Sequence, residues 1–143
     1  MNIREIINEE INNMVNNTQT IVAYHGSSKI KSERHGLPTT IEKFSTLGHW
    51  AQRVSGAYFT PFFDEAKKYA KHSGDKIYQV ELKFNNLADR NILDKIAPIG
   101  NNGEQAKALL IKNGYDGVYD EPMKEIIAFY ESQIKILNVI EIE

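Results

Sequence analysis

The segment Ile77–Phe84 alternates between apolar and polar residues along most of its length. On an extended chain the two kinds fall on opposite sides, in the sets Val80, Leu82, Phe84 and Gln79, Glu81, Lys83. A period of two is that of a β-strand with one face buried. This segment therefore predicts a half-buried strand, and the fold must contain a sheet with a covered face.

Shorter periodic segments fill much of the remaining chain. We expect strands at 20–24, 57–60, 117–119, 125–130 and 133–142, the first ending in the turn 25–27. Residues 64–70 predict a helix capped by Asp64, and residues 104–113 predict another that ends at Gly114. Residues 28–56 look irregular, and loops of this length are often functional. The mixture predicts an α+β domain with an antiparallel or mixed sheet.

The first residues form a separate pattern. Apolar residues recur at helical spacing on one side of residues 1–16, at Ile3, Ile6, Ile7, Ile11, Met14 and Val15. We expect an amphipathic helix over 1–17 and one catalytic domain over 18–143. The preferred interpretation packs the helix on that domain, because an apolar stripe usually faces a core. The alternative is a helix that docks on a partner.

Composition excludes several classes of protein. The chain has 143 residues, a formal net charge of −2 and no cysteine, so disulfides and thiolate chemistry are excluded. Its apolar runs fall short of the ~20 residues that span a bilayer, and its start lacks the apolar core of a secretion signal. Its four histidines lack metal-ligand spacing. We therefore expect a cytoplasmic protein without a metal, and no membrane partner.

Three segments carry side chains suited to chemistry. They are Tyr24-His25-Gly26-Ser27 at a strand end, Gly56-Ala57-Tyr58-Phe59-Thr60 with Ala66 and Tyr69 downstream, and Glu125-Ile126-Ile127-Ala128 with Gln133 and Ile134 downstream. Each segment alone has an ordinary explanation, namely a hydrogen-bonded turn, a packed aromatic pair or a solvated strand end. Their order and spacing together are more informative.

In this order and spacing, the segments resemble the ADP-ribosyltransferase superfamily, in the His-Tyr-Glu branch of diphtheria-like toxins and poly(ADP-ribose) polymerases. The resemblance runs from Tyr24 to about Leu137 and is nearest to small phage-type ADP-ribosyltransferase domains. It implies a split antiparallel or mixed sheet with flanking helices. It also implies that NAD⁺ is consumed as a substrate.

The resemblance implies a role for each matching residue. Glu125 would stabilise the cation that forms as the nicotinamide–ribose bond breaks, and His25 would bind a ribose hydroxyl. Gly26 and Ser27 would contact the nicotinamide amide, while Tyr69 and Tyr58 would pack on the two sides of its ring. In the loop that covers NAD⁺ in relatives, Arg34, with Lys29 and Lys31, would meet the pyrophosphate. Solvated basic residues are the alternative for these three.

Departures from other branches narrow the function. The arginine-modifying branch has an arginine on the first strand and Gln or Glu two residues before the catalytic glutamate; this chain has His25 and Met123. Asp120, Glu121 and Glu131 are alternative carboxylates, but only Glu125 directly opens an apolar strand.

The leading hypothesis is a mono-ADP-ribosyltransferase that acts on a macromolecule, first a protein and second a nucleic acid. It would serve as a phage or toxin effector against a host or defence target, in the host cytoplasm if phage-encoded. The alternatives are an NAD⁺ glycohydrolase, and a non-catalytic binding module that inhibits a partner by contact.

Overall fold

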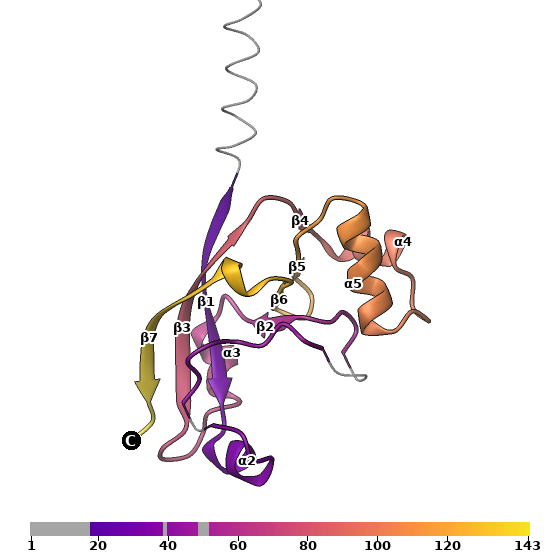
Figure 1. Ribbon diagram of the computed structural model, residues 1–143. Helices are drawn as coiled ribbons and strands as arrows, with labels where there is room; N and C mark the ends of the chain where they lie inside the picture. The colour runs from indigo at the N-terminus through magenta and orange to yellow at the C-terminus, as the bar shows by residue number, and fades with distance from the viewer. Residues whose placement is uncertain (1–17, 39, 49–51) are drawn as a thin grey trace, which may run out of the picture.

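A computed structural model of the chain describes residues 18–38, 40–48 and 52–143 (Figure 1). The elements follow in the order β1 (Gln19–Ser27), α2 (Lys29–Arg34), β2 (Ala57–Phe59), α3 (Phe63–Lys67), β3 (Lys76–Phe84), β4 (Leu87–Ala88), α4 (Arg90–Ile96), α5 (Gly103–Lys112), β5 (Gly117–Asp120), β6 (Glu125–Ala128), the 3₁₀ turn η1 (Glu131–Gln133) and β7 (Ile134–Glu141). The fold is α+β, as the sequence predicts. The expected helix over 1–17 lies outside the described residues.

The first sheet has the strand order β1-β3-β7 and is antiparallel throughout. Its central strand is β3, and the alternation predicted there is confirmed, because Val80, Leu82 and Phe84 are buried while Lys83 is exposed. A central strand is flanked on both edges, so its buried face is the one most strongly marked in the sequence. The sheet's long strands β1 and β3 run side by side down Figure 1.

The second sheet has the order β2-β6-β5-β4 and is mixed, since β4 runs parallel to β5. Its two faces are covered differently. Phe59 and Ile126 belong to a core shared with the first sheet, whereas Val118 and Ile127 pack against α4 and α5. The split, mixed sheet expected from the sequence is therefore present.

Several local expectations need correction. Residues 25–27 do not form a turn after the first strand, because β1 continues through Ser27 in register with β3. Residues 28–56 are not wholly irregular, because Ser28 caps the short helix α2 by accepting a hydrogen bond from the Lys31 amide. Helix α3 begins after Phe62, so Asp64 lies in its first turn and is not its cap. The strand expected over 125–130 ends at Ala128, because the next two amides donate to the Gln133 side chain.

Two elements between β3 and α5 were not expected from the sequence. Strand β4 has only two residues. Asp89 caps the N-terminus of α4, because its side chain accepts a hydrogen bond from the Ile92 amide. The predicted end of α5 is confirmed, since Gly114 has a positive φ of 89° just beyond the helix. Within the described part of the chain, no helix combines the length and apolar character needed to cross a membrane.

Candidate functional site

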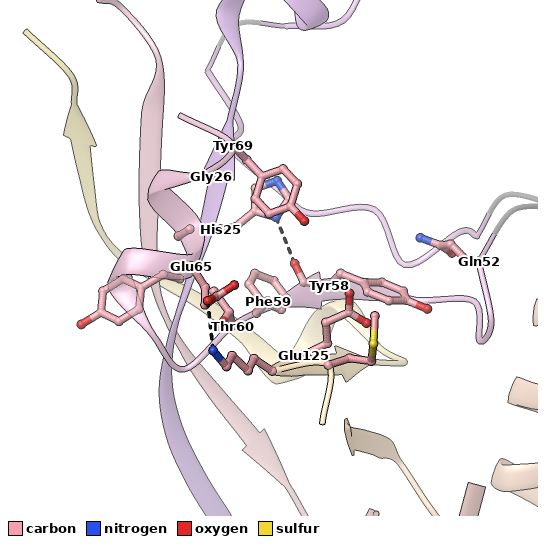
Figure 2. A pocket seen from close by; sticks show the side chains of 13 residues that line it. His25, Gly26, Gln52, Tyr58, Phe59, Thr60, Glu65, Tyr69 and Glu125 are labelled. Atoms are coloured by element: carbon pink, nitrogen blue, oxygen red, sulfur yellow. Dashed lines mark hydrogen bonds and ion pairs between the residues drawn. The ribbon is translucent and has the colours of Figure 1, made fainter. Parts of the chain in front are cut away.

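A cleft of about 330 Å³ opens where the two sheets part, between the edge strands β1 and β2. All three segments singled out in the sequence reach it (Figure 2). The lining residues are Tyr24, His25, Gly26, Gln52, Tyr58, Phe59, Thr60, Glu65, Ala66, Tyr69, Met123, Lys124 and Glu125. Residues as far apart along the chain as Tyr24 and Glu125 thus contribute to one site.

The cleft exists because a β-ladder stops after one pair. Tyr24 and Thr60 exchange two backbone hydrogen bonds, of 2.7 and 2.9 Å, which join β1 to the end of β2. In an antiparallel ladder the next such pair would be Gly26 with Tyr58. Instead, the Nδ1 atom of His25 lies 3.0 Å from the Tyr58 carbonyl oxygen. The imidazole takes the place of the ladder bond, and the two strands diverge beyond it.

This divergence leaves the backbone of Gly26 at the cleft. Tyr24 directs its N–H and C=O away from β3, toward Thr60, and these directions repeat every second residue in a strand. The N–H and C=O of Gly26 therefore face the same way, on the open side of β1. One donor and one acceptor at strand spacing suit a primary amide, which also carries one of each.

His25 is held as a neutral, oriented imidazole. Its ring packs edge-on against Phe44 and Phe59, with ring centroids 5.1 and 6.0 Å apart. Burial lowers the pKa of His25, although the hydrogen bond to the Tyr58 carbonyl opposes this shift. A carbonyl only accepts, so Nδ1 donates and the neutral ring keeps a lone pair on Nε2. His25 also borders a second hollow, of about 620 Å³, formed with residues 37–38 and 40–45.

Helix α3 approaches β1 so closely that only glycine fits at position 26. A Cβ there would lie 2.1 Å from the Ala66 carbonyl oxygen and 3.0 Å from the Tyr69 Cβ. This contact places Tyr69, just beyond the end of α3, beside the cleft with 64% of its surface exposed. An exposed aromatic ring at a cleft is available to stack on a planar ligand.

The Tyr58 side chain is fixed by hydrogen bonds to the backbone of Val54. Its hydroxyl donates to the Val54 carbonyl at 2.6 Å and accepts from the Val54 amide at 3.3 Å. Burial raises the pKa of Tyr58 to about 12, so the phenol stays protonated. The hydroxyl is thus engaged with backbone, and the ring forms the wall of the cleft next to Glu125 (Figure 2).

Glu125 opens β6 and is half-buried in the cleft. Burial raises its pKa; Asp120, its partner across the β5–β6 pair, raises it further, and Arg90 partly offsets both. The preceding residue, Lys124, has a positive φ of 54°, the one such value outside glycine in the described part of the chain. Its N–H donates to the Glu121 carbonyl at 3.0 Å, so this left-handed residue closes the turn between β5 and β6.

The other expected site residues lie elsewhere. Ser27 lines the second hollow and not the cleft, and Arg34, in the last turn of α2, lines neither hollow. Of the alternative carboxylates, Asp120 is buried against Arg90, and Glu131 pairs with Lys43 at 2.8 Å. Of the four candidate carboxylates, Glu125 is therefore the one that reaches the cleft.

Sequence reasoning missed three polar residues of the cleft, namely Gln52, Glu65 and Lys124, and gave no role to Thr60 of the second segment. The carboxylate of Glu65 on α3 forms an ion pair at 3.2 Å with Lys124, the residue before β6. This ion pair links α3 to the turn between β5 and β6. Helical periodicity marks Glu65 only as polar, and no local signal shows that α3 faces the start of β6. Among residues 18–38, 40–48 and 52–143, no three His, Asp or Glu side chains gather as a metal would require.

Gln133 and Ile134, which completed the third segment, have structural roles. The Gln133 side-chain oxygen accepts from the amides of Phe129 and Tyr130, at 3.0 and 2.9 Å, and its nitrogen donates to the Asp116 carbonyl. Ile134 packs on the core shared by the two sheets. Both residues therefore hold the end of β6 in place without entering the cleft.

A scan against models of protein families finds no match for this chain, and no curated protein matches it significantly. The chemistry of the cleft is therefore argued from its own residues. They combine a neutral imidazole, an amide-complementary backbone, two tyrosine rings and a half-buried carboxylate.

Proposed function

We propose that the protein is a mono-ADP-ribosyltransferase, which cleaves NAD⁺ at the nicotinamide–ribose bond and transfers ADP-ribose to a macromolecule. One observation carries the proposal. His25-Gly26, Tyr58 with Tyr69, and Glu125 come from distant parts of the chain and line one cleft. These are the residue types that the resemblance to the His-Tyr-Glu branch assigns to NAD⁺.

The nicotinamide end fits the part of the cleft near Gly26. The open N–H and C=O of Gly26 would pair with the carboxamide, which distinguishes nicotinamide from nicotinic acid. Tyr69 is free to lie against the pyridinium ring, and the ring of Tyr58 forms an adjacent wall. Stacked aromatic faces suit both the flat cation before cleavage and the neutral leaving group after it.

Glu125 supplies the charge for bond cleavage. The C–N bond breaks with its electron pair moving to the nicotinamide nitrogen, and the ribose becomes an oxocarbenium-like cation. A carboxylate bound to a ribose hydroxyl stabilises this cation more than the ground state. The acceptor then forms a bond to the same ribose carbon and loses a proton. Only the ionised form of Glu125 serves this role, so activity should fall as pH falls through its raised pKa.

The position of His25 suits a dinucleotide. It borders both the cleft and the second hollow, whose lining includes Ser27, Ser32 and Thr40. With Nδ1 engaged, Nε2 can accept a hydrogen bond from a ribose hydroxyl. NAD⁺ would lie with nicotinamide on one side of His25 and the adenosine half on the other.

The acceptor and the setting follow from the resemblance alone. A protein side chain is the first choice of acceptor and a nucleic acid the second. The proposed role is that of a phage or toxin effector that acts on a host or defence target in the cytoplasm.

The test is incubation with NAD⁺ labelled in its adenylate part, in a bacterial lysate. Wild type is compared with Glu125→Gln and with the matched control Glu131→Gln, which changes a carboxylate outside the cleft. Label should enter a macromolecular fraction with wild type and the control, and fall by about 100-fold or more with Glu125→Gln.

Other outcomes would select an alternative. Free ADP-ribose and nicotinamide without labelled macromolecules would identify a glycohydrolase. Binding of NAD⁺ or a partner, with no cleavage by folded wild type, would overturn the enzyme proposal and favour a binding module.

A further inference from the structure

Two carboxylates face each other at the start of the β5–β6 hairpin. Asp120 ends β5, Glu125 begins β6, and the two are directly paired. Cross-strand partners project to the same face of a sheet, so both acidic side chains lie on one side of the hairpin. Glu125 reaches the cleft, whereas Asp120 is 5% exposed.

A buried carboxylate needs a counter-charge, and α4 supplies it. Arg90, the first residue of α4, places Nη1 2.9 Å from Oδ2 of Asp120, and its Nε lies 3.3 Å from Asp94. The other oxygen of Asp120 accepts from the Met123 amide at 3.4 Å, within the turn that leads to Glu125. Asp120 thus holds both the shape of the turn and a negative charge next to Glu125.

We infer that Asp120 and Arg90 are positioning residues for Glu125. They form a partly buried ion pair that shapes the hairpin and fixes the charges next to the Glu125 carboxyl group. The inference rests on the proposed role of Glu125 as an ionised carboxylate. It gives Arg90 a function in the site, although Arg90 does not line the cleft. No feature of the sequence connects α4 to this chemistry.

Two other titratable groups near the hairpin have partners of their own. From β2, the Tyr58 hydroxyl bonds to Val54. At the cleft mouth, Glu65 of α3 pairs with Lys124.

Arg53, before β2, is a further charged residue nearby. It contacts the Ala97 carbonyl and lies 3.6 Å from Asp94. The pKa of Glu125 agrees with this arrangement: after burial, Asp120 is the next cause that raises it, and Arg90 is the cause that lowers it.

The experiment compares Asp120→Asn with Arg90→Gln. Asparagine is nearly isosteric and can keep the bond from the Met123 amide, so it removes charge and little else. Asp120→Asn should make Glu125 ionise at lower pH, and Arg90→Gln at higher pH. At a fixed pH on the acid limb of NAD⁺ cleavage, the rates of the two variants should differ by about tenfold. The combined variant should return toward wild type.

A ¹³C NMR titration of the Glu125 carboxyl carbon, assigned with Glu125→Gln, gives the same comparison without any reaction. Displacement of this titration in opposite directions supports the inference, even if no NAD⁺ is cleaved and the proposed function fails. Displacement in the same direction, or none, overturns it.

Asp94→Asn is the matched control. It removes an exposed carboxylate from the same arginine and should leave the Glu125 titration unchanged. If Arg90→Gln does not fold, Asp120→Asn against Asp94→Asn decides the question. An equal titration in those two variants would then overturn the inference.

Discussion

The side chains of Tyr58 and Tyr69 differ in their exposure and in their hydrogen bonds. The Tyr58 hydroxyl bonds to both the N–H and the C=O of Val54, in a buried part of the segment before β2. Tyr69 is 64% exposed and follows α3 on the surface. The family resemblance assigns the same stacking role to both rings, but their surroundings in the structure differ. Tyr58 is a structural wall, and Tyr69 is free to meet a ligand.

We expect Tyr58→Phe to lower the free energy of unfolding by about 1–2 kcal/mol, because it leaves polar backbone groups of Val54 without a partner. Tyr69→Phe is the matched control and should stay within about 0.5 kcal/mol of wild type. Urea unfolding curves of the three proteins measure both values. Equal stability of the two variants would show that the Val54 bonds add nothing net to the fold.

At the scale of single residues, the sequence predicts where chemistry begins but not how it is supported. His25 and Glu125 could be located because His25 follows the apolar run 20–24 and Glu125 precedes the apolar run 126–128, patterns visible within a few residues. Asp120 was visible only as a rival carboxylate. Its burial and its pairing with Arg90 depend on a contact between residues 30 positions apart. Local sequence carries no record of such a contact.

At the scale of elements, the segment 40–48 has no helix or strand but is fixed by contacts with β3 and α5. The Ile41 amide donates to the Tyr78 hydroxyl at 2.7 Å, and Phe44 is 7% exposed against Tyr78 and His25. Lys107 of α5 donates to the Thr46 carbonyl. Because Phe44 touches His25 directly, this segment also fixes one wall of the site.

Phe44→Ala should therefore loosen the segment. We expect a loss of about 3–5 kcal/mol in the free energy of unfolding, since a buried ring is replaced by a cavity. Amide hydrogen exchange at 40–48 should quicken more than exchange in β3. Leu47→Ala, in the same segment but 83% exposed, should change neither quantity. Unchanged protection of 40–48 in Phe44→Ala would mean that other contacts hold the segment.

Elements were predictable in proportion to their buried periodicity. β3 has five buried residues in a pattern close to alternation, and α5 buries three positions on one face and starts with the capping box of Asn102 and Gln105. By contrast, α2 buries no residue and so leaves no apolar signal. Helix α4 places Ile92, Leu93 and Ile96 on one face, but it has only seven residues, too few for a clear period. Strand β4 is too short for any period. Short, shallow elements are defined by the neighbours they meet, which a single sequence does not reveal.

At the scale of the whole molecule, the two sheets share one core while their edges part to form the cleft. The site therefore sits on the boundary between two layers, and its titratable groups are partly removed from water. Burial acts on them with opposite signs: it lowers the pKa of His25 and raises that of Glu125. Each shift links the ionisation of the site to the stability of the entire fold.

For His25, the unfolded chain takes up a proton near pH 6.5, which the folded chain resists until its lowered pKa is reached. Stability should therefore fall as pH falls below 6.5, by at most about 1.4 kcal/mol per pH unit. Glu125 acts in the opposite sense between the unfolded value of 4.5 and its raised pKa, because there the folded chain takes up the proton first.

The two groups can be separated by urea unfolding between pH 7.5 and 5.5. Wild type should lose stability toward pH 5.5, and His25→Gln should lose less over the same range. Glu125→Gln should lose more wherever its raised pKa extends into this range, because the opposing contribution is removed. A His25→Gln slope equal to that of wild type would show that His25 takes up its proton as readily in the folded chain as in the unfolded one, against the burial described above.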